Sequence, residues 1–308
     1  MTSLVHAIRI RAFAKINLDL HIAGVRPDGY HELRTTFQTI DLHDTLTLTP
    51  TRGPFRLACN DPACPADATN LVWRAAAVVW RAARRSGDPE GVRVRIDKRI
   101  PLQAGLGGGS SDGAAALRAF AAFWRIAIGA DRLRRLAAAL GADVPFFMKG
   151  GTALGLNRGD VLRPQVDRPP AWVVLVLPDF GVSTRDAFAW WDSVTRVGAE
   201  LPPSPVGFGG QVAPPRANDR RGNDLQSVVA ERHPEIAAIA DALARAGARQ
   251  AAMSGSGSAV FGLFGSKRAA TAAAATLRAP ARRTLVARTL GRIEFQKRSM
   301  PFRVKRSV

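Results

Sequence analysis

The segment 101–112, PLQAGLGGGSSD, places four glycines and two serines between a strand pattern and a helical pattern. Glycine has no Cβ and lets backbone N–H groups approach a ligand closely. Unpaired N–H groups and the positive end of the dipole at the start of the following helix favour phosphate. The segment therefore predicts an anion cradle, and a nucleotide is the first candidate for its ligand.

This loop differs from two common nucleotide-binding patterns. The Walker pattern ends in Gly-Lys-Ser/Thr, whereas Gly109 is followed by Ser110 and Ser111 with no lysine. A dinucleotide fingerprint needs a third glycine where Ser110 stands and a second strand–helix unit, but two successive apolar helices are expected over 113–140. A flexible linker is the simpler alternative, although a linker would not be bracketed by a strand and an apolar helix.

Asp143 and Lys15 could supply phosphoryl-transfer chemistry, which needs a group for the hydroxyl proton, positive charge and a triphosphate cradle. Asp143 follows a helix that ends near Gly141 and precedes Pro145, which favours extended backbone before it and fixes the direction of the carboxylate. An ordinary turn aspartate is the alternative. Lys15 interrupts an apolar strand, where a buried ammonium would need a carboxylate or phosphate partner. Snorkelling to solvent is the alternative for Lys15.

Alternating, β-rich segments open the chain, and turn signals separate them. We expect strands at 8–13, 16–22, 33–40 and 45–49, a helix at 70–85, a strand at 92–96, and the glycine loop with its two helices. The proline-rich stretch 163–170 suggests a domain boundary before a strand at 172–177. The second half is expected to hold helices at 183–195 and 233–245, a Pro/Gly-rich surface loop at 198–221, and a small-residue loop at 253–258 before a strand at 259–264.

The composition bounds the class of protein. A chain of 308 residues with 46% hydrophobic content can bury a large core and is expected to form two domains. No apolar run approaches the ~20 residues of a membrane span, and residues 1–11 lack a signal-peptide core, so we expect a cytoplasmic protein without membrane contact. Cys59 and Cys64 cannot build a four-ligand zinc site, and we expect two reduced thiols, although their spacing would permit a disulfide.

The formal net charge of +19 is compatible with nucleic-acid binding, because Lys and Arg contacts to phosphate dominate that affinity. Most of the excess is arginine scattered along an alanine-rich chain, which indicates compositional bias. Nucleic acid is therefore not an expected partner, although a basic nucleic-acid-binding protein stays open as an alternative that predicts salt-dependent retention on RNA. The basic tail 292–308 is expected to be a solvated end.

Three segments together carry a family resemblance: AKINL at 14–18, AGLGGGSSDGAAAL at 104–117 and MSGSGSAVFGLF at 253–264. In this order and at these distances they resemble the three motifs of the GHMP small-molecule kinases, over nearly the whole chain. RPDGYHELRTTFQTID at 26–41 and GADVPFF at 141–147 are similar to the branch of that superfamily whose acceptor is a cytidyl-linked methylerythritol. Phe13 stands where a proline often precedes the Ala-Lys pair.

The resemblance implies an α+β, two-domain GHMP kinase-like fold, with an ATP-binding domain at 1–165, a C-terminal domain with the basic tail at 166–308, and the active site in the cleft between them. It implies ATP-dependent phosphorylation of the 2-hydroxyl of the cytidyl-linked alcohol in isoprenoid precursor biosynthesis. Homoserine or mevalonate as the acceptor remains an alternative, and a non-catalytic ATP sensor would be expected to lack Lys15 or Asp143. Magnesium is expected with ATP, held by phosphate oxygens and water, because Asp112 is the one acidic residue of the glycine motif and no protein ligand is predicted.

The same resemblance assigns the site residues. Lys15 and Asp143 are the catalytic pair, with Lys15 steering the Asp143 carboxylate toward the acceptor hydroxyl. The ATP-binding residues are Asn70 and Leu71 at the adenine end, Lys98 near the phosphates, and the loop residues Pro101, Leu102, Gln103, Ala104, Gly105, Leu106, Gly107, Gly108, Gly109, Ser110 and Ser111. The substrate-binding residues are Asn17, Tyr30, His31, Thr184 and Phe188, of which Phe188 could equally belong to the core. Tyr30 is the only tyrosine of the chain, and its ring beside the His31 imidazole suits a cytosine, although a turn tyrosine also serves in packing.

Overall fold

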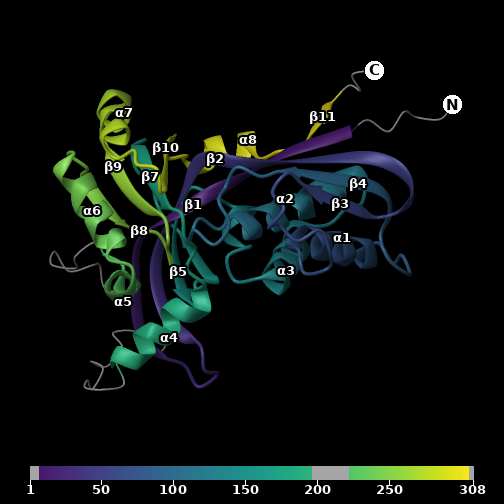
Figure 1. Ribbon diagram of the computed structural model, residues 1–308. Coiled ribbons are helices and arrows are strands. Elements are labelled where there is room, and N and C mark those ends of the chain that lie inside the picture. Colours follow the sequence, from purple (N-terminus) through teal and green to yellow (C-terminus); the bar gives the residue numbers. More distant parts are fainter. Residues whose placement is uncertain (1–6, 196–221, 305–308) are drawn as a thin grey trace.

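The computed structural model describes residues 7–195 and 222–304, and two sheets with helices packed on them make up this part of the chain (Figure 1). Two long antiparallel strands, β1 (Ala7–Val25) and β2 (His31–Pro54), run through both halves of the molecule. The sequence predicted four shorter strands; the turn expected between the second and the third is present at 26–30, but β1 and β2 each continue through one of the other two expected breaks. Their pairing shifts register between Phe13 and Lys15, where β2 also skips from His43 to Thr39. Such bulges bend a strand without ending it.

The larger sheet has seven strands in the order β11–β1–β2–β4–β3, with β5 paired to β2 and β6 paired to β5. Its shorter strands are β3 (Arg56–Cys59), β4 (Glu90–Asp97), β5 (Thr152–Asn157), β6 (Val161–Pro164) and β11 (Phe302–Val304). Strand β4 alternates buried Val92 and Val94 with exposed Arg93 and Arg95, as the sequence predicted. One face of β4 therefore packs in the core and the other is exposed to solvent.

Three helices cover the apolar face of this sheet: α1 (Leu71–Ala82), α2 (Gly108–Phe123) and α3 (Ala130–Leu140). Fully buried Val79 and Phe120 pack with Ile10 of β1 in one core cluster. Helix α1 begins after Asn70, whose side chain accepts a hydrogen bond from the backbone N–H of Val72 and so satisfies an otherwise unpaired donor. A short 3-10 turn, η1 (Phe146–Met148), follows α3.

The smaller sheet has the order β10–β7–β9–β8. It consists of β7 (Trp172–Pro178), β8 (Gln250–Met253), β9 (Val260–Phe264) and β10 (Arg282–Arg288), with helices α4 (Thr184–Thr195), α5 (Asp224–Arg232), α6 (Glu235–Arg245) and α7 (Lys267–Thr276). Strand β7 has the continuous apolar sequence WVVLVLP, which is typical of a strand with both faces buried, and both of its faces are buried. Val174 and Val176 face the helices, whereas Val173 and Leu175 face the strands β1 and β2.

Helix α5 was not predicted, and the helix expected from residue 233 begins at Glu235 after His233 has ended α5. The signal was present: Asn223 accepts a hydrogen bond from the Leu225 N–H, as an N-cap does before an apolar run. The surface loop predicted at 198–221 lies outside the described residues.

The basic tail differs from the solvated end that the sequence predicted. Residues 292–298 form α8 (Arg292–Arg298), and β11 pairs with the start of β1. Phe295 is 1% exposed and packs edge-on against Phe13, with ring centroids 5.8 Å apart. An apolar residue in a basic segment therefore ties the tail to the larger sheet.

The predicted domain boundary at residue 165 falls between β6 of the larger sheet and β7 of the smaller one. It remains a proposal, because β1 also packs on the smaller sheet and β11, from the end of the chain, belongs to the larger one. In the described ranges 7–195 and 222–304, every helix is too short or too polar to cross a bilayer.

Candidate active site

The three motifs of the sequence meet where the two sheets pack together. The backbone N–H of Lys15 donates to the Leu106 carbonyl at 3.0 Å. The backbone N–H of Asn17 donates to Ser254 Oγ at 3.1 Å, and Ser254 Oγ donates to the Gly105 carbonyl at 3.0 Å. Residues far apart in sequence thus form one hydrogen-bonded unit.

Two glycines of the loop are required by its shape. Gly105 and Gly107 have φ of +70° and +69°, a conformation that favours glycine. A Cβ at Gly105 would overlap the backbone of Ser254, and a Cβ at Gly107 would lie 2.8 Å from the Phe147 ring. Helix α2 starts directly afterwards, and no side chain caps its first turn. The geometry is that of an anion cradle, and the individual ATP contacts of residues 101–111 remain predictions.

Lys15 is buried beside this loop, with its side chain 5% exposed, so snorkelling to solvent is excluded. Its Nζ donates to Asn17 Oδ1 at 2.5 Å and to the Gly105 carbonyl at 2.8 Å, and it lies 3.9 Å from Asp143 Oδ2. Burial lowers the pKa of Lys15, and the Asp143 charge offsets part of that effect. The ammonium is therefore held by two neutral oxygens and one carboxylate.

Asp143 lies in the turn after α3, and its side chain is 33% exposed. The turn is fixed on both sides, because Val144 N–H donates to the Gly141 carbonyl at 3.2 Å and Phe146 N–H donates to the Asp143 carbonyl at 3.2 Å. A carboxylate with one partly open side next to a buried ammonium can orient or accept a hydroxyl proton.

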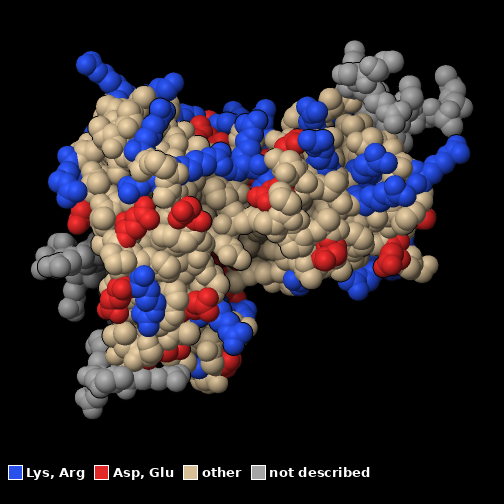
Figure 2. Space-filling view, viewed as in Figure 1, with Lys and Arg blue, Asp and Glu red and all other residues tan. Residues whose placement is uncertain are grey.

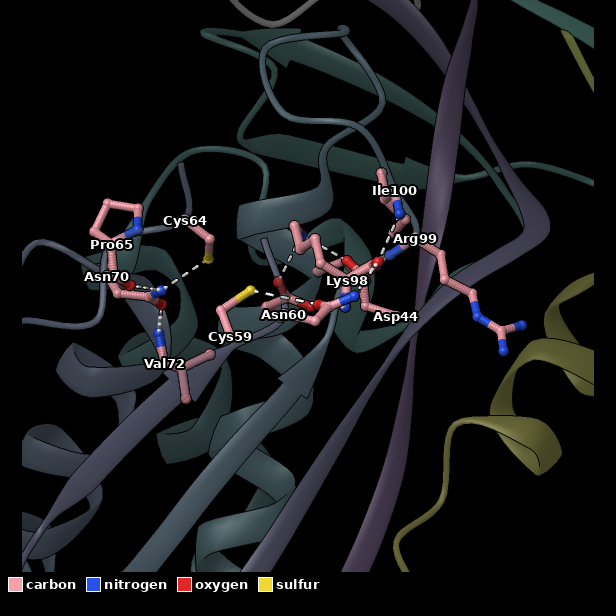
Figure 3. A network of polar contacts seen from close by, with 12 residues as sticks. Asp44, Cys59, Asn60, Cys64, Pro65, Asn70, Val72, Lys98, Arg99 and Ile100 are labelled. Carbon is pink, nitrogen blue, oxygen red and sulfur yellow. Dashed lines mark hydrogen bonds and ion pairs between the residues drawn. The ribbon is translucent and has the colours of Figure 1, made fainter. Parts of the chain in front are cut away.

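Lys98 is engaged by the protein rather than open to a ligand. Its Nζ donates to Asp44 Oδ2 at 2.6 Å (Figure 3) and to Asp112 Oδ2 at 2.8 Å, and the side chain is 3% exposed. Burial opposes its charge, but Asp112 and Asp44 outweigh burial and raise the pKa of Lys98. Burial raises the pKa of Asp112 to about 7, although Lys98 counteracts it. Lys98 is thus a buried ion pair partner, and a contact with phosphate remains a prediction.

Figure 3 shows two neighbouring groups of polar contacts, one around Lys98 and one around Asn70, the residue predicted at the adenine end. Asn60 brackets Lys98, accepting from its N–H at 2.6 Å and donating to its carbonyl at 3.2 Å. The side-chain amide of Asn70 accepts a hydrogen bond from the Val72 N–H and donates one to the Pro65 carbonyl. Its backbone N–H and carbonyl are also paired, with Asp67 and Arg74, and an adenine contact by Asn70 remains a prediction.

Cys59 and Cys64 are free thiols, and burial raises the pKa of Cys64 to about 12. Leu71, the other residue predicted at the adenine end, is half-buried and packs toward Gly113 of α2.

Two of the predicted base-recognition residues, His31 and Phe188, are in contact. Its ring stacks on Phe188 with centroids 4.5 Å apart and an interplanar angle of 24°, and it meets Trp191 edge-on at 5.6 Å. Its Nε2 lies 2.8 Å from Asp192 Oδ1. Helix α4 thus holds the imidazole with three side chains.

Tyr30 and Thr184 contact residues that were not predicted as their partners. Tyr30 is 57% exposed, with the Arg158 guanidinium 5.0 Å from the centre of its ring. Thr184 Oγ1 lies 3.1 Å from Ser256 Oγ of the third motif. Sequence reasoning missed Asp192, because an acidic residue on an exposed helix carries no local signal of its partner.

Two predicted ligand contacts point into the protein. Ser111 is 2% exposed, and its hydroxyl donates to the Phe13 carbonyl at 2.6 Å. Asn17 is 3% exposed, and its Nδ2 donates to Thr35 Oγ1 at 2.7 Å while its Oδ1 accepts from Lys15. Both side chains hold the site together, and direct ligand contacts by them remain predictions.

The part of the chain that the structure describes does not present a ready-made magnesium site. Within residues 7–195 and 222–304 there is no group of three or more His, Cys, Asp or Glu side chains that could hold a metal ion. Asp112, the acidic residue of the glycine motif, is bonded to Lys98. The donor set of the described residues does not fit a protein-held cation.

Comparison with known proteins identifies the family. The model of the GHMP kinases N terminal domain matches residues 70–151, and that of the GHMP kinases C terminal matches residues 214–283. A 4-diphosphocytidyl-2-C-methyl-D-erythritol kinase of Moorella thermoacetica is 42% identical over 290 residues, which cover 92% of this chain and 99% of that protein. The chain belongs to the GHMP kinases.

Further likenesses agree with this assignment. A 4-diphosphocytidyl-2-C-methyl-D-erythritol kinase of Solibacter usitatus is 44% identical to this GHMP kinase over 277 residues, covering 86% of this chain and 83% of that protein. A crystal structure of 4-(cytidine 5'-diphospho)-2C-methyl-D-erythritol kinase has a TM-score of 0.73 at 33% identity, covering 92% of this chain and 99% of that chain. The two-domain α+β fold and the small-molecule kinase activity predicted from the sequence are confirmed.

We expect Asp143→Asn to lower turnover by at least ~100-fold, the range in which a general base contributes, while ATP affinity changes no more than a few-fold. The amide keeps the shape of the side chain and removes its charge. ATP turnover and ATP binding measured on the same preparation test this. Asp241→Asn, an exposed acid of α6, serves as the control, and an active Asp143→Asn enzyme would refute the role.

Asp112 should make stability depend on pH. Its pKa is raised in the folded state from 3.8 to about 7, so folding takes up a proton, and the stability gained below pH ~4 is lost as pH rises through ~7. The loss reaches at most ~1.4 kcal/mol per pH unit. Asp112→Asn should flatten the unfolding free energy across this window in urea titrations. Identical pH profiles for the two proteins would contradict the raised pKa.

Proposed function

We propose that this GHMP kinase transfers the γ-phosphoryl group of ATP to the 2-hydroxyl of 4-diphosphocytidyl-2-C-methyl-D-erythritol, giving the 2-phosphate and ADP on the route to isopentenyl diphosphate. The observation that carries the proposal is the Lys15–Asp143 pair, at 3.9 Å, beside a glycine loop that has the shape of an anion cradle. The names of the relatives at about 40% identity support the acceptor.

In this mechanism the acceptor hydroxyl lies against the partly open side of Asp143. Asp143 takes the hydroxyl proton as the hydroxyl oxygen forms its bond to the γ-phosphorus and the bond from that phosphorus to the bridging oxygen of ADP breaks. Lys15 orients the Asp143 carboxylate, and its own hydrogen bonds to Asn17 and Gly105 hold the ammonium in place. The backbone N–H groups at the start of α2 hold the triphosphate.

Magnesium accompanies ATP in this proposal and is held by phosphate oxygens and water, because the described residues present no cluster of acidic ligands. It would neutralise phosphate charge. No protein side chain is assigned to it.

The acceptor's cytosine is proposed to bind at His31. The Asp192 carboxylate can only accept at Nε2, so in a neutral imidazole Nδ1 is the hydrogen-bond acceptor. An acceptor at that position suits the exocyclic amino group of cytosine. The exposed ring of Tyr30 and the ring of Phe188 supply aromatic faces for the base.

Two other acceptors, mevalonate and homoserine, remain the main rivals. Neither carries an aromatic base, so neither would use the cluster of His31, Phe188 and Asp192. A non-catalytic ATP sensor would have no need of a buried Lys15 beside Asp143.

A coupled assay of ADP release with three acceptors decides between these candidates. We expect turnover with the cytidyl-linked methylerythritol, and turnover lower by at least ~100-fold with mevalonate and with homoserine, because they leave the base-binding side chains unpaired. Activity on either rival and none on the cytidyl compound would refute the proposed acceptor and leave the kinase assignment intact.

Asp192→Ala should raise the KM for the cytidyl acceptor by about 10-fold, in the range expected for a lost hydrogen bond to a charged group, and should change kcat much less. Asp192→Asn should partly rescue binding, since the amide oxygen can still accept from His31. Asp186→Ala, an exposed acid on the same helix, is the control. Equal effects of Asp192→Ala and Asp186→Ala would contradict a positioning role for Asp192.

A further inference from the structure

One face of the larger sheet is open and carries a regular set of basic side chains. In residues 8–12 of β1 and 45–49 of β2, and on β3 and β4, the apolar residues point toward helices α1, α2 and α3, and the intervening residues point the other way. These outward residues form what we call the arginine–threonine face: Arg9, Arg11, Thr45, Thr47, Thr49, Arg56, Arg93 and Arg95. Among them Arg9, Arg56, Arg93 and Arg95 are exposed.

The strand register arranges this face in lines. Thr47 of β2 lies opposite Arg9 of β1 on one side and opposite Arg95 of β4 on the other. Because neighbouring strands are about 4.8 Å apart, the arginine line of β1 and that of β4 are about 10 Å apart. Along each strand the arginines repeat about every 7 Å. Short threonine side chains thus form a floor between two lines of long basic ones.

Acidic residues are sparse on this face. Asp97 shares the face with Arg95 and pairs with its Nε at 3.1 Å. His43 lies at one end of the threonine line and is affected by the same positive charge. Burial lowers the pKa of His43, and the charges of Arg11, Arg298 and Arg99 lower it further. In Figure 2 blue side chains predominate at the upper right of the molecule, over the region of β4 and β11.

Phe302 adds an aromatic surface at the edge of the face. It is 42% exposed on β11, lies opposite Arg9 in register, and has the Arg11 guanidinium 5.7 Å from the centre of its ring. Proteins that bind single strands combine a basic surface along the backbone with aromatic side chains on which bases stack.

We propose that the arginine–threonine face binds single-stranded RNA. The phosphodiester backbone would run along the threonines of β2, with arginines of β1 and β4 on its two sides and a base on Phe302. Threonine hydroxyls can contact phosphate and sugar oxygens without reading sequence. A bilayer fits less well, because a flat anionic surface would touch the arginine tips and leave the threonine floor unused.

The proposal does not depend on the identity of the kinase acceptor. No residue of the arginine–threonine face contacts Lys15 or Asp143 in the hydrogen bonds and ion pairs of the described residues. A variant of this face should therefore keep kinase activity, and the two functions can be tested separately.

The test is fluorescence anisotropy of a 5′-labelled single-stranded RNA of about 12 nucleotides, a length within the range of single-strand sites. We expect binding that weakens steeply between roughly 50 and 200 mM salt. Arg9→Ala/Arg93→Ala should weaken binding at least ~10-fold and reduce the log–log salt slope by about 1.4, or ~0.7 for each lost phosphate contact. Thr47→Glu should weaken binding without removing any arginine.

The matched control is Arg245→Ala/Arg278→Ala, which removes the same charge from exposed positions on α6 and after α7. This pair should keep both RNA affinity and salt slope near those of the parent protein, and all variants should keep kinase turnover. Equal losses for the two arginine pairs would show that net charge alone attracts RNA and would overturn the proposal. Tighter binding to vesicles containing phosphatidylglycerol than to RNA would overturn it in favour of a membrane.

Discussion

One carbonyl oxygen, that of Gly105, holds the site together. It accepts hydrogen bonds from Lys15 Nζ at 2.8 Å and from Ser254 Oγ at 3.0 Å. These donors come from β1 and from the loop before β9, so a single atom of the glycine loop ties the two sheets to the phosphate cradle. The approach is possible only because Gly105 lacks a Cβ and has a φ of +70°. The distance between the cradle and Lys15 is therefore fixed by backbone packing.

The two buried lysines of the site show how their partners decide their roles. Lys98 is surrounded by two carboxylates at 2.6 and 2.8 Å, which raise its pKa and saturate its charge. Lys15 has two neutral oxygens and a carboxylate at 3.9 Å, and burial lowers its pKa. Removing one carboxylate of such a buried pair would leave an uncompensated charge, so the Lys98 ammonium is committed to its two protein partners. Lys15 keeps its charge available to the reacting groups.

Local sequence signals predicted several elements of the fold and of the site. The glycine loop, the helix after Asn70 and the alternation of β4 each depend on neighbours within a few residues. Contacts between distant residues were not predictable: Lys98 meets Asp44 across 54 positions, and His31 meets Asp192 across 161. The tail looked solvated because its charges dominate its composition, whereas one apolar residue, Phe295, decides its place in the fold.

The register shift between Phe13 and Lys15 separates two surfaces that one strand supplies. Before it, the odd-numbered Arg9 and Arg11 point away from the helices, while Ile8 and Ile10 enter the core beneath them. After it, the even-numbered Ala14 and Ile16 pack toward the smaller sheet, and Lys15 turns to the glycine loop. Across this point the pairing advances two residues on β1 and four on β2, and this irregularity interrupts the regular alternation of the two faces. If the alternation of Arg9 and Arg11 continued unbroken, Lys15 would lie on their face of the sheet, away from the glycine loop and Asp143.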